Sequence, residues 1–138
     1  MSTDHYTRLE HAYRAAPCNE SIRPTMTISQ GSAVVRFDIR PEMFHAMRAV
    51  HGAFYFKALD DAAFFAANSV VTDVFVLTVS FTVQFLRPIA DGVLIAEGRL
   101  VKEGTLLFAE SVLTNADGRQ LARGTGVFAR GRQEIVPR

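Results

Sequence analysis

The segment from residue 51 to residue 69, HGAFYFKALDDAAFFAANS, limits what this chain can fold into more than any other part. Ala and Phe dominate it, and Lys57, Asp60 and Asp61 carry its only formal charges. We expect one long helix over 51–69 that is apolar on nearly all sides. Because such a helix must be buried over most of its surface, a sheet has to curve around it.

The two adjacent carboxylates lie midway along this predicted helix. Neighbouring residues on a helix point about 100° apart, so Asp60 and Asp61 cannot both lie along one solvent edge. Carboxylates are rarely buried unless they are paired or used, and apolar surroundings raise their pKa. The pattern favours a carboxylate that acts as a base or a nucleophile. A hydrogen-bonded carboxylate without a chemical role is the alternative.

The rest of the chain predicts one short helix and a sheet. Tyr6, Leu9 and Tyr13 have helical spacing, so we expect an N-terminal helix within residues 1–16, closed by Pro17. Hydrophobic alternation and turn residues predict strands at 25–29, 33–39, 73–87, 93–101, 105–114 and 120–130, followed by a frayed tail over 131–138. In the long strand, one face is expected to carry Leu77, Val79, Phe81, Val83 and Phe85. The expected fold class is α+β, a single domain over 1–138 with a curved antiparallel sheet around the central helix.

Composition excludes several classes of function. The 138 residues are 49% hydrophobic with a formal net charge of +1, and the scattered Lys and Arg give no footprint for nucleic acid. No apolar run reaches the roughly 18 residues of a membrane span, and the polar N-terminus lacks a secretory signal. We therefore expect a cytoplasmic protein. Cys18, the single cysteine, excludes an internal disulfide and a Cys-based zinc site, and no His and carboxylate spacing favours a metal.

Five features occur together in one order. They are His51-Gly52 at the start of the helix, Asp60 nine residues after the His, Asn68-Ser69 at the helix end, VSFTVQFLRP at 79–88, and a Lys-x-Gly turn at 102–104. Through them, about residues 40 to 130 of the chain resemble the hotdog-fold acyl-CoA thioesterases of the phenylacetic-acid-pathway and mammalian thioesterase superfamily member type. The resemblance implies a hotdog domain that hydrolyses a small aryl- or medium/long-chain acyl-CoA without a cofactor.

The resemblance also implies roles for individual residues. Asp60 would attack the thioester carbon or activate water, the Gly52 N–H would polarise the thioester carbonyl, and Thr78 would position the water or the attacked group. Asp61 falls where the family often has a small polar residue. For substrate binding, the implied residues are Ala53, Asp61, Phe85, Arg87, Lys102, Glu103, Gly104 and Thr105.

On the N-terminal helix, His5 and His11 are expected to lie at the surface. Two histidines near the start of the central helix have open roles. His45 stands where the family usually has Asn or Gln, and either donates a hydrogen bond to the thioester or nucleophilic water, or is a loop residue. His51 is expected to be a structural helix-start residue rather than a proton shuttle. The second glycine of the family's HGG is Ala53 here. At the Lys-x-Gly turn, Lys102 with Gly104 and Thr105 would meet the phosphates of coenzyme A, since free N–H groups in a turn suit an anion; solvated strand-edge charges are the alternative.

The spacing along the helix predicts a dimer. Gly52 and Asp60 are eight residues apart, about 12 Å along one helix, so they cannot reach one carbonyl from the same helix. A helix N-terminus suits a developing oxyanion. Two antiparallel helices from two subunits would bring Gly52 of one chain to Asp60 of the other, as in the hotdog dimer with two equivalent sites. Family analogy adds pairing into a homotetramer.

Two other functions stay open on sequence alone. One is a hotdog hydratase or dehydratase that acts on acyl thioesters. Such enzymes favour a His paired with a carboxylate, and His51 and Asp60 are too far apart on one helix to form that pair without a partner subunit. The other is a non-catalytic acyl-CoA-binding module, which His45 in place of the amide would allow. Release of free thiol separates these two from a thioesterase.

Overall fold

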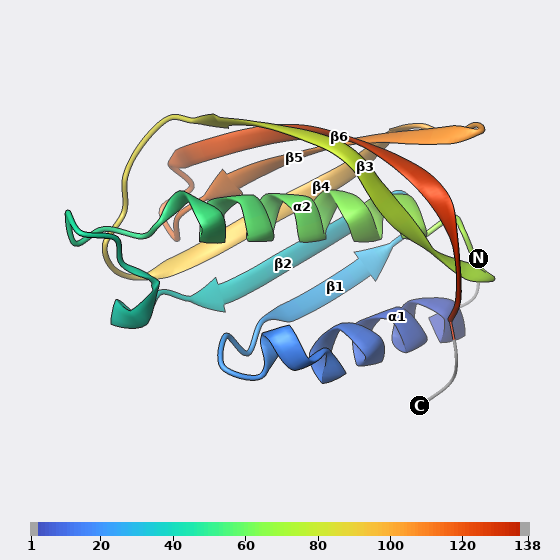
Figure 1. Cartoon of the computed structure of the whole chain (residues 1–138), viewed down its shortest axis with the longest axis horizontal. Coiled ribbons are helices and arrows are strands. Elements are labelled where there is room, and N and C mark those ends of the chain that lie inside the picture. Colours follow the sequence, from blue (N-terminus) through green and yellow to red (C-terminus); the bar gives the residue numbers. More distant parts are fainter. Residues whose placement is uncertain (1–2, 136–138) are drawn as a thin grey trace.

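The computed structural model describes residues 3–135 and contains two α-helices and six strands. Figure 1 shows the long helix α2 lying along the inside of a curved sheet, with α1 at the side of β1. The elements in chain order are α1 (Thr3–Ala15), the 3-10 helix η1 (Pro17–Asn19), β1 (Thr25–Ser29), β2 (Ser32–Asp38), the 3-10 helix η2 (Pro41–Met43), α2 (Gly52–Asn68), β3 (Val74–Phe85), β4 (Val93–Lys102), β5 (Leu106–Thr114) and β6 (Gln120–Glu134).

The sheet is antiparallel throughout, with the spatial order β1-β2-β4-β5-β6-β3. The strand that follows α2 in sequence, β3, therefore lies at one edge, and β1 lies at the other. This confirms the predicted curved antiparallel sheet around one central helix with a short helix before it. None of the helices in residues 3–135 is long and apolar enough to cross a membrane.

Small side chains allow α2 to lie close against the sheet. Ala58, Ala62 and Ala66 are fully buried on the inner face of the helix. Beneath them, a Cβ on Gly98 of β4 would lie 2.1 Å from the carbonyl oxygen of Ala62, so only glycine fits that position. Ser111 of β5 donates a hydrogen bond of 2.8 Å to the Leu59 carbonyl. Helix and sheet thus meet backbone to backbone, which fixes the position of α2.

A β-bulge in β3 changes the predicted alternation. Thr78 pairs with Phe128 and Ser80 with Val127, which leaves Val79 as the extra residue. The prediction that Leu77 and Val79 share an inward face with Phe81 was wrong, because the bulge exchanges the two faces. Leu77 and Val79 are 59% and 60% exposed, whereas Phe81 packs against the core. Ahead of the bulge, it is Val76 and Thr78 that point inward.

Two further expectations were wrong. The tail was expected to fray from residue 131, but β6 continues to Glu134 and Ile135 is buried, with its N–H bonded to the Asp73 carbonyl; residues 136–138 lie outside the described part. His5 was expected at the surface, yet only 2% of it is exposed. Its Nε2 lies 2.9 Å from the Asn68 carbonyl oxygen, so it joins α1 to the end of α2.

Candidate active site

Asp60 lies in the third turn of α2 and faces the inward part of β3. Its Oδ1 accepts a hydrogen bond of 3.0 Å from the Thr78 hydroxyl. Thr78 reaches it because it lies two residues after the buried Val76 and therefore on the same face of β3, and the bulge at Val79 lets Phe81 lie on that face as well. The structure therefore brings together two residues that lie 18 positions apart in the chain and that the sequence predicted as catalytic partners.

Burial makes Asp60 a weaker acid than an ordinary aspartate. The pKa of its carboxyl is raised to about 6, mainly because burial removes solvent from the charged form. The hydrogen bond from Thr78 lowers this pKa, the charge of Asp61 raises it and the charge of Lys57 lowers it. A carboxylate with a raised pKa is a stronger base and nucleophile when ionised. Asp60 thus has a more basic carboxylate than an ordinary aspartate and lines a cavity.

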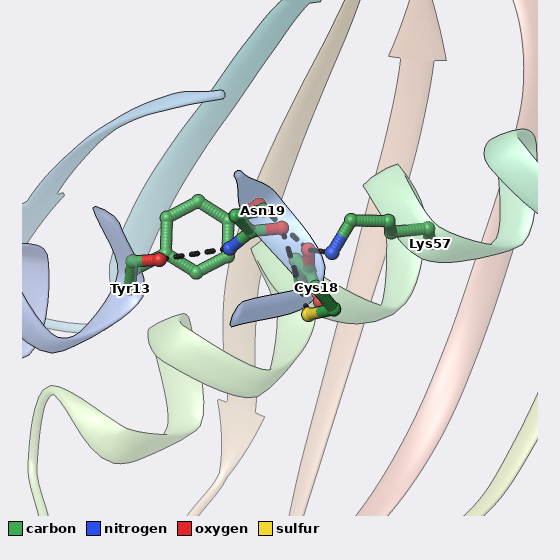
Figure 2. A network of polar contacts seen from close by, with 5 residues as sticks. Tyr13, Cys18, Asn19 and Lys57 are labelled. Carbon is green, nitrogen blue, oxygen red and sulfur yellow. Dashed lines mark hydrogen bonds and ion pairs between the residues drawn. The ribbon is translucent and has the colours of Figure 1, made fainter. Parts of the chain in front are cut away.

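Asp61 lies in a different environment from its neighbour. Its Oδ2 accepts a 2.6 Å hydrogen bond from the Tyr13 hydroxyl of α1 and a 2.9 Å hydrogen bond from Lys57, one helical turn earlier. Burial, together with the charge of Asp61, raises the pKa of Tyr13, which therefore keeps its proton and donates. Figure 2 shows Tyr13 and Lys57 in this polar network with Asn19 and Cys18 of η1. Tyr13 and Lys57 hold the Asp61 carboxylate in place, whereas the Asp60 carboxylate accepts a hydrogen bond from the Thr78 hydroxyl.

The start of α2 is arranged around the Gly52 N–H. His51 is the N-cap residue, and its Nδ1 accepts a 2.9 Å hydrogen bond from the Ala53 N–H. The His51 carbonyl accepts from the Phe54 N–H. Since His51 occupies the donors of Ala53 and Phe54, the Gly52 N–H is the group at the positive end of the helix that a ligand can use. His51 thus has the position of a structural cap.

A cavity of about 420 Å³ opens at this helix start. His45, Gly52, Phe85 and Arg87 all line it. The Phe85 ring lies so close to Gly52 that a Cβ there would be 2.9 Å from it. His45 is held in a tight loop in which its Nδ1 accepts from the Met47 N–H at 3.1 Å, so in the neutral ring the proton is on Nε2.

The predicted coenzyme A residues fall into two places. Arg87 lies in the cavity beside Gly52, where its guanidinium donates to the Gln120 carbonyl at 2.9 Å. The turn after β4, with Lys102 at its start, is tied down by Arg130 of β6, which donates to the Gly104 carbonyl at 2.6 Å and lies 3.8 Å from Glu103. The carbonyl side of this turn is thus occupied, and Lys102 remains exposed.

The predicted site residues therefore form two groups on one chain. Gly52, His51, His45, Phe85 and Arg87 surround the start of α2, while Asp60 and Thr78 lie two turns further on. The turn at 103–105 lies toward the second group, because Leu106 pairs with Ala129, which also pairs with Leu77. Within one chain, none of the predicted site residues joins these two groups into a single reaction centre.

Sequence reasoning missed residues that shape the site. Tyr13 was read only as an apolar residue of the first helix, and its hydroxyl gives no local signal for a partner 48 residues away. Lys57 was recognisable, since its spacing of four from Asp61 favours an ion pair on a helix. Arg130 holds the turn at 103–105 from a distant strand. Within residues 3–135, no three His, Cys, Asp or Glu side chains gather into a group that could hold a metal ion.

Comparison with known proteins decides the family. The model of the thioesterase superfamily matches residues 47–122, more than half of the chain, and the match includes the start of α2, Asp60 and Thr78. The chain belongs to the thioesterase superfamily. A curated relative, a "putative esterase" of Saccharolobus solfataricus, is 26% identical over 102 residues, which cover 73% of each chain.

Several solved structures have the same fold. The PaaI protein of the phenylacetic acid degradation operon of E. coli superimposes with a TM-score of 0.87 at 22% identity, over 98% of this chain and 99% of that one. A thioesterase family protein from Silicibacter pomeroyi gives a TM-score of 0.82 at 24% identity, over 92% and 99%. These likenesses confirm the hotdog fold that the sequence predicted.

Proposed function

We propose that this thioesterase-superfamily protein hydrolyses an acyl-CoA thioester, with a small aryl or a medium- or long-chain acyl group, and that Asp60 carries the reaction. The observation that supports this most strongly is the pair of Asp60 and Thr78 beside a cavity, with the pKa of Asp60 raised to about 6 by burial. Asp61 is bound by Tyr13 and Lys57 and has a supporting role.

In the proposed reaction, the ionised Asp60 makes the attack possible in one of two ways. Either its oxygen adds to the thioester carbon, or it takes a proton from a water that adds there, with Thr78 orienting the attacking group. Both routes pass through a tetrahedral oxyanion that collapses with release of the coenzyme A thiolate. In the first route the collapse leaves a mixed anhydride on Asp60, which water hydrolyses to the free acid and the regenerated carboxylate; in the second the attacking water has already supplied the oxygen of the free acid. In both routes the thiolate takes up a proton. A backbone N–H aimed at the oxyanion stabilises this state by about 3 kcal/mol.

The donor for the oxyanion is the Gly52 N–H of a second copy of the chain. Gly52 and Asp60 of one chain are about 12 Å apart along α2. The edge strand β3 supports pairing, because it is 12 residues long and exposes Leu77, Val79 and Phe85. A long apolar edge is a ready template for a second strand. We propose a homodimer with two equivalent sites that assembles further into a homotetramer.

In this dimer, coenzyme A would bind across both chains. Lys102 with the N–H groups of Gly104 and Thr105 is the proposed contact for its phosphates, and Arg87 and His45 line the cavity next to Gly52. The hold of Arg130 on the Gly104 carbonyl fixes the shape of the turn, which favours a preformed anion site.

The first prediction tests the choice between the carboxylates. With a panel of acyl-CoA substrates, the protein should release free thiol, and Asp60→Asn should lower kcat by a factor of about 1,000 or more, since an essential group is lost. Asp61→Asn, the matched control on the next residue, should retain activity within about tenfold. The assay is thiol release under saturating substrate, with circular dichroism to check the fold.

Other outcomes of this assay point to other functions. A double bond that is hydrated while the thioester stays intact would indicate a hotdog hydratase. Saturable binding of acyl-CoA without turnover of any kind would indicate a binding module. Equal activity of the two variants, or loss only in Asp61→Asn, would refute the role of Asp60.

A further inference from the structure

A second cavity, of about 310 Å³, lies between the N-terminal segment and the central helix, and Asp60 lines it. This volume is within the range of small-molecule sites. It is separate from the cavity at Gly52, with which it shares no lining residue. A substrate attacked by Asp60 therefore has room for one of its parts here.

The wall that α2 and β3 give to this cavity is aromatic. Phe64 lies one turn beyond Asp60 on the same face of α2, Phe65 lies next to it, and Phe75 comes from the start of β3. The Phe64 and Phe65 rings are 4.9 Å apart and meet edge to face. Such a wall favours apolar groups through burial of their surface.

The opposite wall comes from α1, η1 and the residue between them, and beside Tyr13 and Asn19 it carries three small side chains. Ala12 of α1 and Ala16, the extended residue between α1 and η1, line the cavity together with Cys18 of η1. Both alanines are half-buried and Cys18 is exposed at the rim. Larger residues at these positions would occupy the cavity itself. All three precede residue 47, where the match to the family model begins.

Tyr13 fastens this wall to α2. Its side chain is 4% exposed, its hydroxyl donates to Asp61 and its ring meets Phe65 edge to face at 5.2 Å. The Asn19 amide donates to the Tyr13 carbonyl at 2.8 Å, which ties η1 to the end of α1 (Figure 2). Because Lys57 pairs with Asp61, the two formal charges at this end of the cavity cancel.

We propose that this cavity is the subsite for the acyl group of the substrate, that it takes an uncharged apolar acyl group, and that the α1–η1 wall limits the size of that group. The inference rests on the proposed thioester hydrolysis and adds to it the place of the acyl group and the residues that set its size. The cavity at Gly52, with Arg87 and His45, is left for the polar coenzyme A part. The limit on acyl size is then a property of residues 12–18, outside the motif shared with the family.

The first test uses Cys18, the single cysteine, and needs no turnover. A thiol reagent is reacted with the protein in the presence of coenzyme A or of non-hydrolysable thioethers of coenzyme A with acyl-like chains of increasing length. Labelling should slow by about tenfold or more at saturation once the chain is long enough to reach the rim, and coenzyme A alone should leave it unchanged. Equal protection by coenzyme A alone, or no protection by any thioether that binds, overturns the proposal.

The second test changes the wall. Ala12→Leu and Ala16→Leu add apolar bulk inside the cavity. Ala15→Leu adds the same bulk to the last residue of α1, at an exposed position that does not line the cavity. The two cavity variants should lower kcat/KM for the longest accepted acyl group by about tenfold or more relative to the shortest, a discrimination typical of an apolar pocket. Ala15→Leu should leave the ratio at the wild-type value. Equal losses for all acyl lengths, or an unchanged ratio in both cavity variants, overturn the proposal.

The two tests separate this inference from the proposed function. A protein that cleaves no thioester but is protected at Cys18 by the longer thioethers refutes hydrolysis and keeps the subsite. A protein that is active, loses activity in Asp60→Asn and shows neither protection nor a changed acyl preference keeps hydrolysis and refutes the subsite.

Discussion

At the scale of single residues, the contrast between Asp60 and Asp61 carries most of the functional argument. The two carboxylates are adjacent in the chain, and each is half-buried. Asp61 accepts from a phenol and an ammonium group, whereas Asp60 accepts from the Thr78 hydroxyl. One carboxylate is thus committed to structure and the other is available for chemistry.

This contrast predicts opposite effects on the pH profile of kcat. The proposed reaction needs ionised Asp60, so kcat should fall as the pH drops through about 6, the raised pKa of this group. Asp61→Asn removes a negative charge that raises this pKa, so the acid limb should move to lower pH. Lys57→Met removes a positive charge that lowers it, so the limb should move to higher pH. Tyr13, Thr78 and Cys18, which also border Asp60, are unchanged in both variants.

The measurement is kcat against pH between about 4.5 and 8 for both variants, since each shift should be on the order of half a unit or more. Asp117→Asn, in an exposed turn that lines neither cavity, is the control and should not move the limb. Shifts of the same sign in Asp61→Asn and Lys57→Met would contradict the assignment of the limb to Asp60.

His45 is expected to act as a donor from Nε2, because its Nδ1 is engaged by the Met47 N–H. Asparagine can also donate, so His45→Asn should keep activity within about tenfold, while His45→Ala should lose about 100-fold, the usual cost of one donor to a reacting oxygen. Met47→Ala, an exposed change in the same loop, is the control for loop disruption. Wild-type kcat in both His45 variants would make it a loop residue.

At the scale of elements, the site depends on how closely α2 lies against the sheet and on the bulge in β3. Gly98 and Ser111 let α2 approach β4 and β5 with its backbone, which fixes the height of Asp60 above the sheet. The bulge at Val79 then brings Thr78 to the same face. Gly98, Ser111 and Val79 line neither of the two cavities, yet they set the distance between Asp60 and Thr78.

Gly98→Ala should therefore destabilise the whole domain. The added Cβ would lie 2.1 Å from a helix carbonyl oxygen, so α2 or β4 has to move, at a cost of about 3 kcal/mol. Gly104→Ala is the matched control, since its Cβ would lie 3.5 Å from the nearest atom, and it should change stability by less than about 1 kcal/mol. Urea denaturation of both variants gives the comparison; equal midpoints would refute the close approach.

At the scale of the whole molecule, the proposed active unit contains two chains. Gly52→Pro removes the N–H donor while suiting the first position of a helix, and the extended ψ of 141° at His51 suits a following proline. Gly52→Ala keeps the donor and meets the same Phe85 ring, so it is the matched control. We expect Gly52→Pro to be inactive and Gly52→Ala to be active.

Gly52→Pro chains are then unfolded and refolded with an equal amount of Asp60→Asn chains. Half of the dimers should be mixed, and each mixed dimer should have one of its two sites intact. The mixture should therefore regain about a quarter of wild-type activity. Thiol release measures the activity, and native mass spectrometry confirms the mixed dimers. Mixed dimers without activity would place Gly52 and Asp60 in the same site of one chain.

The amino-acid sequence alone determined the elements and the position of the two carboxylates. An apolar helix with Asp60 and Asp61, a glycine at its start and strands of alternating polarity are local patterns, and local patterns depend on residues within a few positions of one another. From them the curved sheet around one helix could be predicted, whereas the candidate roles of Asp60, Gly52 and Thr78 came from the resemblance to a known family.

Only the tertiary structure decided which carboxylate is bound and which is available. Tyr13 reaches Asp61 across 48 residues and Arg130 reaches Gly104 across 26, distances over which spacing carries no signal. The bulge at Val79 is likewise set by pairing with β6 rather than by the sequence of β3, whose alternation runs unbroken through it. The physical reason is the same in each case: these contacts form only when the packing of distant elements fixes which side chains face each other.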